Sequence, residues 1–163
     1  MSLSTSIALA STALSLGERE LKAFIDAALR FFEKITQEPA EIGEAAIHFD
    51  QPPLLDFTGL IQVSGSCSGF VYVTLPGEML VKMLASIGET QPDEEICRDF
   101  AGEIANTVAG NVRQSFGNSF HISVPTPLDS TAAAGLVFPG PSFVLPVRWR
   151  GGDACIVIAL QPQ

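Results

Sequence analysis

The sequence has few positive charges. Its 163 residues contain nine lysines and arginines against 18 aspartates and glutamates, which gives a formal net charge of −9. A nucleic-acid partner needs a basic patch that neutralises phosphates. The acidic balance therefore argues against nucleic-acid binding. A folded protein with a cationic patch, or a small basic metabolite, stays open as a partner.

Cysteine and histidine are scarce and do not form a recognisable site. Cys67, Cys97 and Cys155 are widely spaced, without a Cys-x-x-Cys pair, and His48 and His121 stand alone. This usage is typical of reduced thiols in a cytoplasmic protein. It gives no basis for a metal site, so we expect no cofactor of the protein's own.

Long apolar runs are also missing. No stretch reaches the roughly 18 residues of a membrane span, so no membrane partner is expected. Residues 1–16 are small and mildly apolar but lack the Lys/Arg-rich start of a secretory signal. We expect residues 1–17 to be a flexible lead-in, with a weak export signal as the alternative. Residues 18–163 are long and apolar enough for one domain with its own core.

The hydropathy pattern predicts an α/β domain of the α+β type, with long helices packed on a mainly antiparallel sheet. Helices are expected over residues 18–37, 77–87 and 92–117. A capping box starting at Ser15 introduces the first helix. Pro92 is expected at the first helical position of the third, and Gly117 as its left-handed C-terminal cap.

Strands are expected over residues 57–63, 70–75, 120–124, 135–138, 142–149 and 153–160. Turn composition predicts hairpins at residues 64–69 and at Gly151-Gly152. Pro146 within a predicted strand suggests a sheet edge or a bulge.

The predicted third helix has an unusual polar face. At about 100° per residue, one side carries a group of polar and small residues: Asp99, Glu103, Asn106, Gly110 and Arg113. The opposite side carries an apolar stripe from Ile96 to Val112. The small residues Gly102, Ala105, Ala109 and Gly110 flank the polar face and leave it open to a partner surface. Asn and Gly are poor helix formers, so their presence lowers the stability of this helix and indicates that the face has a function other than helix formation.

This face and its surroundings resemble the CheC/CheX family of chemotaxis phosphatases, and within it the single-site, CheX-like branch. The family pattern is Glu-x-x-Asn on a long helix, often with Asp or Ser four residues earlier and Gly-Asn a few residues later. Here these are Glu103, Asn106, Asp99 and Gly110-Asn111. The resemblance covers roughly residues 20–160 and includes the first helix (24–36), the first hairpin (59–71) and residues 122–126. Only one Glu-x-x-Asn is found, and the interval from Asn106 to Pro125 looks shorter than the family's.

The resemblance implies dephosphorylation of the aspartyl phosphate on a CheY-like response regulator of two-component signalling. An acyl phosphate is already activated, so the catalyst mainly places a water in line while Mg²⁺ on the partner absorbs charge. Asn106 is expected to position that water, and Glu103 to pair with a lysine beside the partner's phosphorylation pocket. Asp99 is expected to orient the site or cap a contact. Gly110 serves either docking clearance or close packing.

Two other functions stay open. The short interval after the helix favours a non-catalytic adaptor that binds receiver domains on the same fold. Gly65-Ser66-Cys67-Ser68-Gly69 matches a cysteine nucleophile elbow, which needs a strand–turn–helix context, although the following residues are strand-forming. A homodimer is also expected, because family members often associate through sheet edges and the hairpin at 142–160 carries few charges to protect an edge.

Overall fold

The computed structural model describes residues 3–5, 7–8 and 17–162 of the protein. Its named helices are α2 (Glu18–Thr36), α3 (Gly77–Ser86), α4 (Glu94–Phe116) and α5 (Ser130–Ala134). Its strands are β1 (Glu41–Ile42), β2 (Ala46–His48), β3 (Phe57–Gly65), β4 (Cys67–Leu75), β5 (Phe120–Ile122), β6 (Thr126–Pro127), β7 (Ser142–Trp149) and β8 (Gly152–Pro162).

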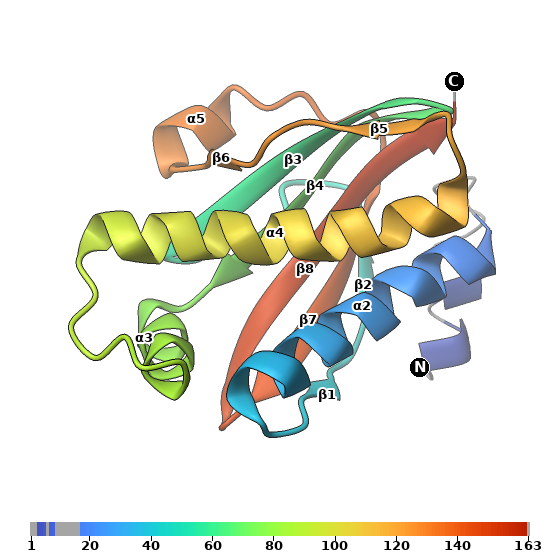
Figure 1. The fold of residues 1–163 in the computed structure, drawn as a ribbon. Helices are drawn as coiled ribbons and strands as arrows, with labels where there is room; N and C mark the ends of the chain where they lie inside the picture. The colour runs from blue at the N-terminus through green and yellow to red at the C-terminus, as the bar shows by residue number, and fades with distance from the viewer. Residues whose placement is uncertain (1–2, 6, 9–16, 163) are drawn as a thin grey trace.

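These strands form one antiparallel sheet in the order β1-β7-β8-β4-β3-β5, with β2 also paired to β7 and β6 to β3. Helices α2, α3 and α4 lie together on one face of this sheet (Figure 1). The predicted α+β class, with long helices on a mainly antiparallel sheet, is confirmed.

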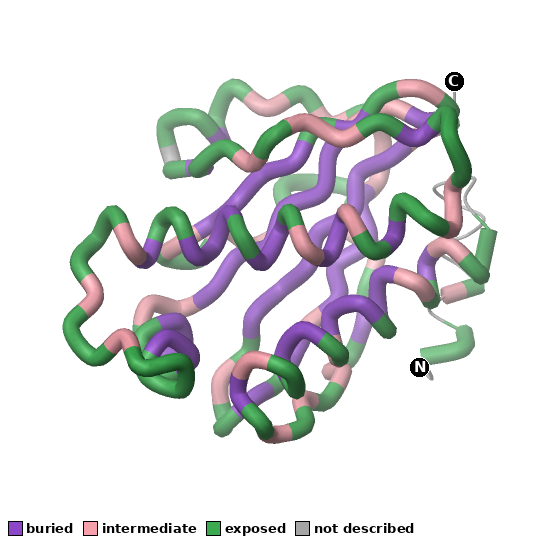
Figure 2. Tube along the Cα trace, in the orientation of Figure 1, coloured by how far each residue is buried: buried purple, intermediate pink, exposed green. Residues whose placement is uncertain are grey.

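Both faces of the central strands are buried (Figure 2). The larger core fills the space between the sheet and α2, α3 and α4. The smaller core lies on the opposite face, where Leu128 and Ala133 cover Tyr72 and Val157. The far side of the sheet is therefore shielded by the segment around the short helix α5 instead of by a second layer of long helices.

The N-terminal predictions are met only in part. Helix α2 begins at Glu18 with Gly17 as its N-cap, and glycine has no side chain that could make a capping bond. Ser15 of the predicted capping box lies outside the described residues, as do residues 1–2, 6 and 9–16 of the predicted flexible lead-in. The predicted burial of one helix face is confirmed by Leu21, Phe24 and other residues of α2.

One strand prediction is wrong, and one hairpin prediction is confirmed with a tighter turn than expected. Residues 135–138 form no strand; Leu136 and Phe138 are apolar because they pack on the smaller core. The segment before them forms α5, whose N-cap Asp129 accepts a hydrogen bond from the backbone N–H of Ala132 at 2.8 Å. The hairpin predicted at residues 64–69 is confirmed, because β3 pairs antiparallel with β4; its turn is tighter than expected, since β3 continues to Gly65 and β4 starts at Cys67.

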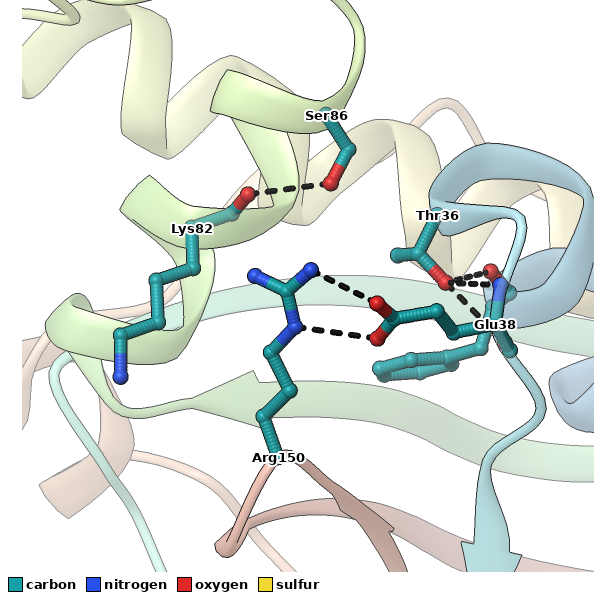
Figure 3. A network of polar contacts seen from close by, with 6 residues as sticks. Thr36, Glu38, Lys82, Ser86 and Arg150 are labelled. Carbon is teal, nitrogen blue, oxygen red and sulfur yellow. Dashed lines mark hydrogen bonds and ion pairs between the residues drawn. The ribbon is translucent and has the colours of Figure 1, made fainter.

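The turn between β7 and β8 is shifted by one residue from its predicted place. It contains Arg150 and Gly151, with φ of 49° and 77°, and Gly152 already pairs with Trp149. Two positive φ values are the geometry of a type I′ hairpin. The Arg150 guanidinium extends from this turn to the Glu38 carboxylate just after α2, with N···O distances of 2.8 and 3.0 Å (Figure 3).

The β7–β8 hairpin has no free edge. β7 pairs with β8 on one side and with β1 and β2 on the other, and β8 pairs with β4. Pro146 is therefore not in an edge strand; its carbonyl accepts from Gly43, in the gap between β1 and β2. Because N and O of a strand residue point to the same side, the missing N–H of Pro146 also faces this gap. The expectation that this hairpin offers an unprotected edge for dimerisation is wrong.

None of the helices in the described ranges has both the length and the apolar character that crossing a membrane requires.

Candidate functional site

Helix α4 places the candidate residues, and its ends are fixed by local chemistry. Its N-cap is Asp93, whose Oδ1 accepts the N–H of Ile96 at 2.9 Å. Pro92 thus precedes the cap instead of occupying the first helical position, which corrects the prediction by two residues. Gly117 ends the helix as predicted and has a positive φ of 81°, but its ψ of −165° is not that of the left-handed cap expected for it.

The predicted polar face of α4 is open. Asp99, Glu103, Asn106 and Arg113 are exposed, while the apolar stripe from Phe100 to Val112 is buried. Glu103 and Asn106 point away from the sheet because they lie opposite that stripe. The acid and the amide therefore stand side by side on solvent-facing turns of one helix.

The small residues of α4 have two different functions. Gly102, Ala105 and Ala109 are buried, so they serve the packing of α4 against the rest of the fold, although Gly102 also borders the groove described next. Gly110 differs, because a Cβ built on it meets no atom of the described residues within 4 Å. Close packing therefore does not account for this glycine.

A groove of about 440 Å³ runs between α4 and the segment that follows β5. It is lined by Glu95, Arg98, Asp99, Gly102, Glu103, Asn106, Pro125, Thr126 and Pro127. The structure therefore brings Asp99, Glu103 and Asn106 to one concave site. Gly110 and Arg113 do not line it.

The second wall of the groove was not predicted as part of the site. Residues 125–127 come about 20 positions after the amide, and they reach the groove because β6 pairs with Gly59 and Leu60 of β3. Ser123 fixes this wall: its N–H donates to the Gln62 carbonyl at 2.9 Å, and its Oγ accepts the Gln62 N–H at 2.9 Å. The only sequence signal was the proline after a predicted strand.

The groove is acidic. Glu95, Asp99 and Glu103 line it, and Arg98 is the one cation among its lining residues. Arg98 is held by Glu94 one turn earlier, at 2.7 Å. The described residues contain no group of three or more His, Cys, Asp or Glu side chains arranged to hold a metal ion.

The lining residues limit the chemistry that this site can perform. They include no cysteine, serine, histidine or lysine, and Thr126 carries the one side-chain hydroxyl. Activating Thr126 as a nucleophile would need an adjacent general base or a similar device. The site is better suited to orienting a water and a docked partner through an amide and carboxylates.

The cysteine hydrolase alternative is wrong. Cys67 is buried at the start of β4, and the residues after it continue as a strand instead of a helix. Burial raises the pKa of its thiol, which disfavours the reactive thiolate. His48 and His121 both lie in strands.

Comparison with known proteins supports the family resemblance. A family model described as chemotaxis phosphatase CheX matches residues 57–137, a segment that contains Glu103 and Asn106. Among curated proteins, none matches this chain.

Solved structures show the same fold. A putative chemotaxis protein from Desulfovibrio vulgaris Hildenborough is 17% identical with a TM-score of 0.74, covering 88% of this chain and 97% of its own. The chemotaxis protein CheX from Vibrio vulnificus is 19% identical with a TM-score of 0.73, covering 88% and 99%. The CheX–CheY–BeF₃–Mg²⁺ complex from Borrelia burgdorferi is 17% identical with a TM-score of 0.68, covering 87% and 97%. The chain belongs to the CheX-like family of chemotaxis proteins.

Proposed function

We propose that the protein is a phosphatase that hydrolyses the aspartyl phosphate of a CheY-like response regulator. The observation that carries this proposal is the pairing of Glu103 and Asn106, both exposed, in a groove without a nucleophile activated for attack. The similar Borrelia burgdorferi structure holds CheY together with BeF₃ and Mg²⁺, which is the kind of partner this groove would meet.

In this proposal Asn106 positions the attacking water. A carboxamide donates and accepts hydrogen bonds at once, and it does not titrate. It can therefore hold a water in line with the phosphorus–oxygen bond at any physiological pH. Mg²⁺ bound by the partner supplies the charge stabilisation of the transferring group, so the protein needs no metal of its own.

Glu103 docks the partner. Its carboxylate lies about one turn from Asn106 on the same helix face, and an anion there can pair with a lysine beside the partner's phosphorylation pocket. This contact would place the phosphoryl group above Asn106. Asp99, one turn before Glu103 and lining the same groove, orients the site or caps a contact.

The test is phosphate release from a CheY-like receiver domain phosphorylated with acetyl phosphate in Mg²⁺. Asn106→Ala should lower kcat about 30- to 1,000-fold, the range that 2–4 kcal/mol of lost transition-state positioning gives. Glu103→Gln should mainly raise KM. Gln114→Ala is the matched control, because Gln114 is an exposed amide on the same helix but does not line the groove.

Two results would contradict the proposal. Equal turnover by wild type and Asn106→Ala would remove the assigned mechanism. Tight binding of the phosphorylated receiver without faster phosphate release would favour the non-catalytic adaptor, which uses the same groove only to bind.

A further inference from the structure

A second hollow opens beside the groove, at the N-terminal end of α4. It has a volume of about 430 Å³. It is lined by Leu54, Leu55, Asp56, Phe57, Thr58, Glu94, Arg98, Pro127, Leu128 and Asp129. Arg98 and Pro127 line the groove as well, so the two depressions adjoin along these two residues. We call their combined lining the docking strip.

The acids of the second hollow are held in place. Asp56 accepts the N–H of Gly77 at 2.8 Å, and Asp129 accepts that of Ala132 at 2.8 Å. Glu94 pairs with Arg98. Each of these bonds uses one oxygen of its carboxylate, and a carboxylate has about four acceptor sites on two oxygens. The acids are therefore oriented and still able to accept bonds from an incoming cation.

The docking strip concentrates the negative charge of the protein. Six acids and one arginine line it, which is a net charge of −5 out of the −9 of the whole chain. Apolar surface lies between these charges, where Leu55 is 36% exposed at the second hollow. Carboxylates around an apolar surface fit a lysine or arginine, whose long stem packs on apolar atoms while its charge stays at the rim.

A receiver domain docked at the groove would also contact the second hollow, because its interface is wider than the groove. The groove extends along α4 from Glu95 to Asn106, which is about 16 Å at the helical rise. A standard interface buries about 800 Å² per partner, a patch about 30 Å across. A receiver seated over Glu103 and Asn106 must therefore contact surface beyond the groove. The adjoining concave surface on the Arg98 side is the second hollow.

We infer that the second hollow receives a basic segment of the same receiver domain and determines which receivers are accepted. The inference rests on the proposed function, because the occupant is the partner of the Glu103–Asn106 site. An accepted receiver is expected to carry a lysine or arginine at a distance from its phosphorylated aspartate of about half the width of a standard interface.

The test uses charge changes at Leu55 and at a matched position. Leu55→Lys places a cation in the hollow, and Leu55→Glu adds an anion. Val81→Lys is the control, because Val81 is 43% exposed on α3 and lies outside the docking strip. The probe is a CheY-like receiver domain, in its beryllofluoride form for binding and phosphorylated by acetyl phosphate for turnover.

Leu55→Lys should raise Kd and KM about tenfold, which corresponds to about 1.4 kcal/mol, and leave kcat within about twofold. Leu55→Glu should lower Kd. Both effects should shrink as salt is raised, because exposed charges are screened. Val81→Lys should change Kd by less than about twofold.

The two charge variants distinguish the inference from a folding defect, and Asn106→Ala distinguishes it from the proposed function. Equal weakening by Leu55→Lys and Leu55→Glu, or no change with either, would overturn the inference. Asn106→Ala should bind the beryllofluoride form as wild type does while losing turnover, which tests catalysis independently. Wild type that neither binds nor dephosphorylates any receiver would overturn both the proposed function and this inference.

Discussion

Gly59 of β3 and Gly102 of α4 meet backbone to backbone. A Cβ on Gly59 would lie 2.7 Å from the Cα of Gly102 and 2.6 Å from the carbonyl oxygen of Ala101. A Cβ on Gly102 would lie 3.3 Å from the Cβ of Pro125, on the far wall of the groove. This glycine pair therefore sets both the height of α4 over the sheet and the width of the candidate site.

Gly59→Ala should destabilise the protein and disturb the site. The atoms that the new methyl group meets belong to the helix backbone and cannot rotate away, so α4 must shift. Overpacking of this kind costs about 1–3 kcal/mol of unfolding free energy. Urea denaturation measures that loss. Phosphate release should fall as well, because Glu103 and Asn106 move with the helix.

The control lies on α4, the helix that Gly59→Ala would displace, and should change stability in the opposite direction. Gly110 has open space around its Cα, and alanine is favoured over glycine in a helix interior by about 1 kcal/mol. Gly110→Ala should therefore raise the urea midpoint. Destabilisation by both variants would show that an added methyl group is unfavourable at either glycine, whatever its surroundings.

The sequence predicted the elements whose apolar pattern is strong. The apolar spacing of α2, α3 and α4 and the apolar runs of β3, β4, β7 and β8 placed these elements within a few residues. Residues 135–138 were wrongly predicted as a strand because apolar residues that pack on a sheet face have the composition of a strand. Helix α5 before them was missed because five residues are too few to show a period.

The sequence predicted one wall of the candidate site, on α4, but not the other. Glu103 and Asn106 lie one turn apart on one helix, so a helical projection brings them together. The wall at residues 125–127 depends on the pairing of β6 with β3, which no local pattern specifies. The place of Arg98 between the two hollows could not be predicted for the same reason, because it depends on the segments that lie opposite α4 in the fold.

The contact between Glu38 and Arg150 should make stability depend on pH at the acid end. Hydrogen bonding from the Arg150 guanidinium holds the pKa of the Glu38 carboxyl below its ordinary value (Figure 3). A carboxyl with a lowered native pKa stabilises the fold above its ordinary pKa, and this contribution is lost as pH falls through the native pKa. The contact joins the end of α2 to the β7–β8 turn, so its loss loosens two elements at once.

Glu38→Gln should therefore be less stable than wild type at pH 7, and the difference should disappear toward pH 3. Chemical denaturation across this range measures it. Glu33→Gln is the matched control, since Glu33 is an exposed acid of α2 outside this contact. A stability difference for Glu38→Gln that stays constant with pH would mean that the ion pair contributes nothing.

The three cysteines should resist labelling until the protein unfolds. Cys67, Cys97 and Cys155 are all buried. Burial raises the pKa of each thiol, to about 11 for Cys155. The thiolate is the reactive form, so at pH 8 Cys155 would be about 0.1% ionised even if a reagent reached it.

Labelling of native protein with iodoacetamide, followed by mass spectrometry, should show all three cysteines modified slowly and at similar rates. In guanidinium chloride all three should react together at the rate of an ordinary thiol. Selective modification of Cys67 in the native protein would mean that its thiol is activated, and nucleophilic chemistry at the start of β4 would then compete with the groove on α4 as the functional site.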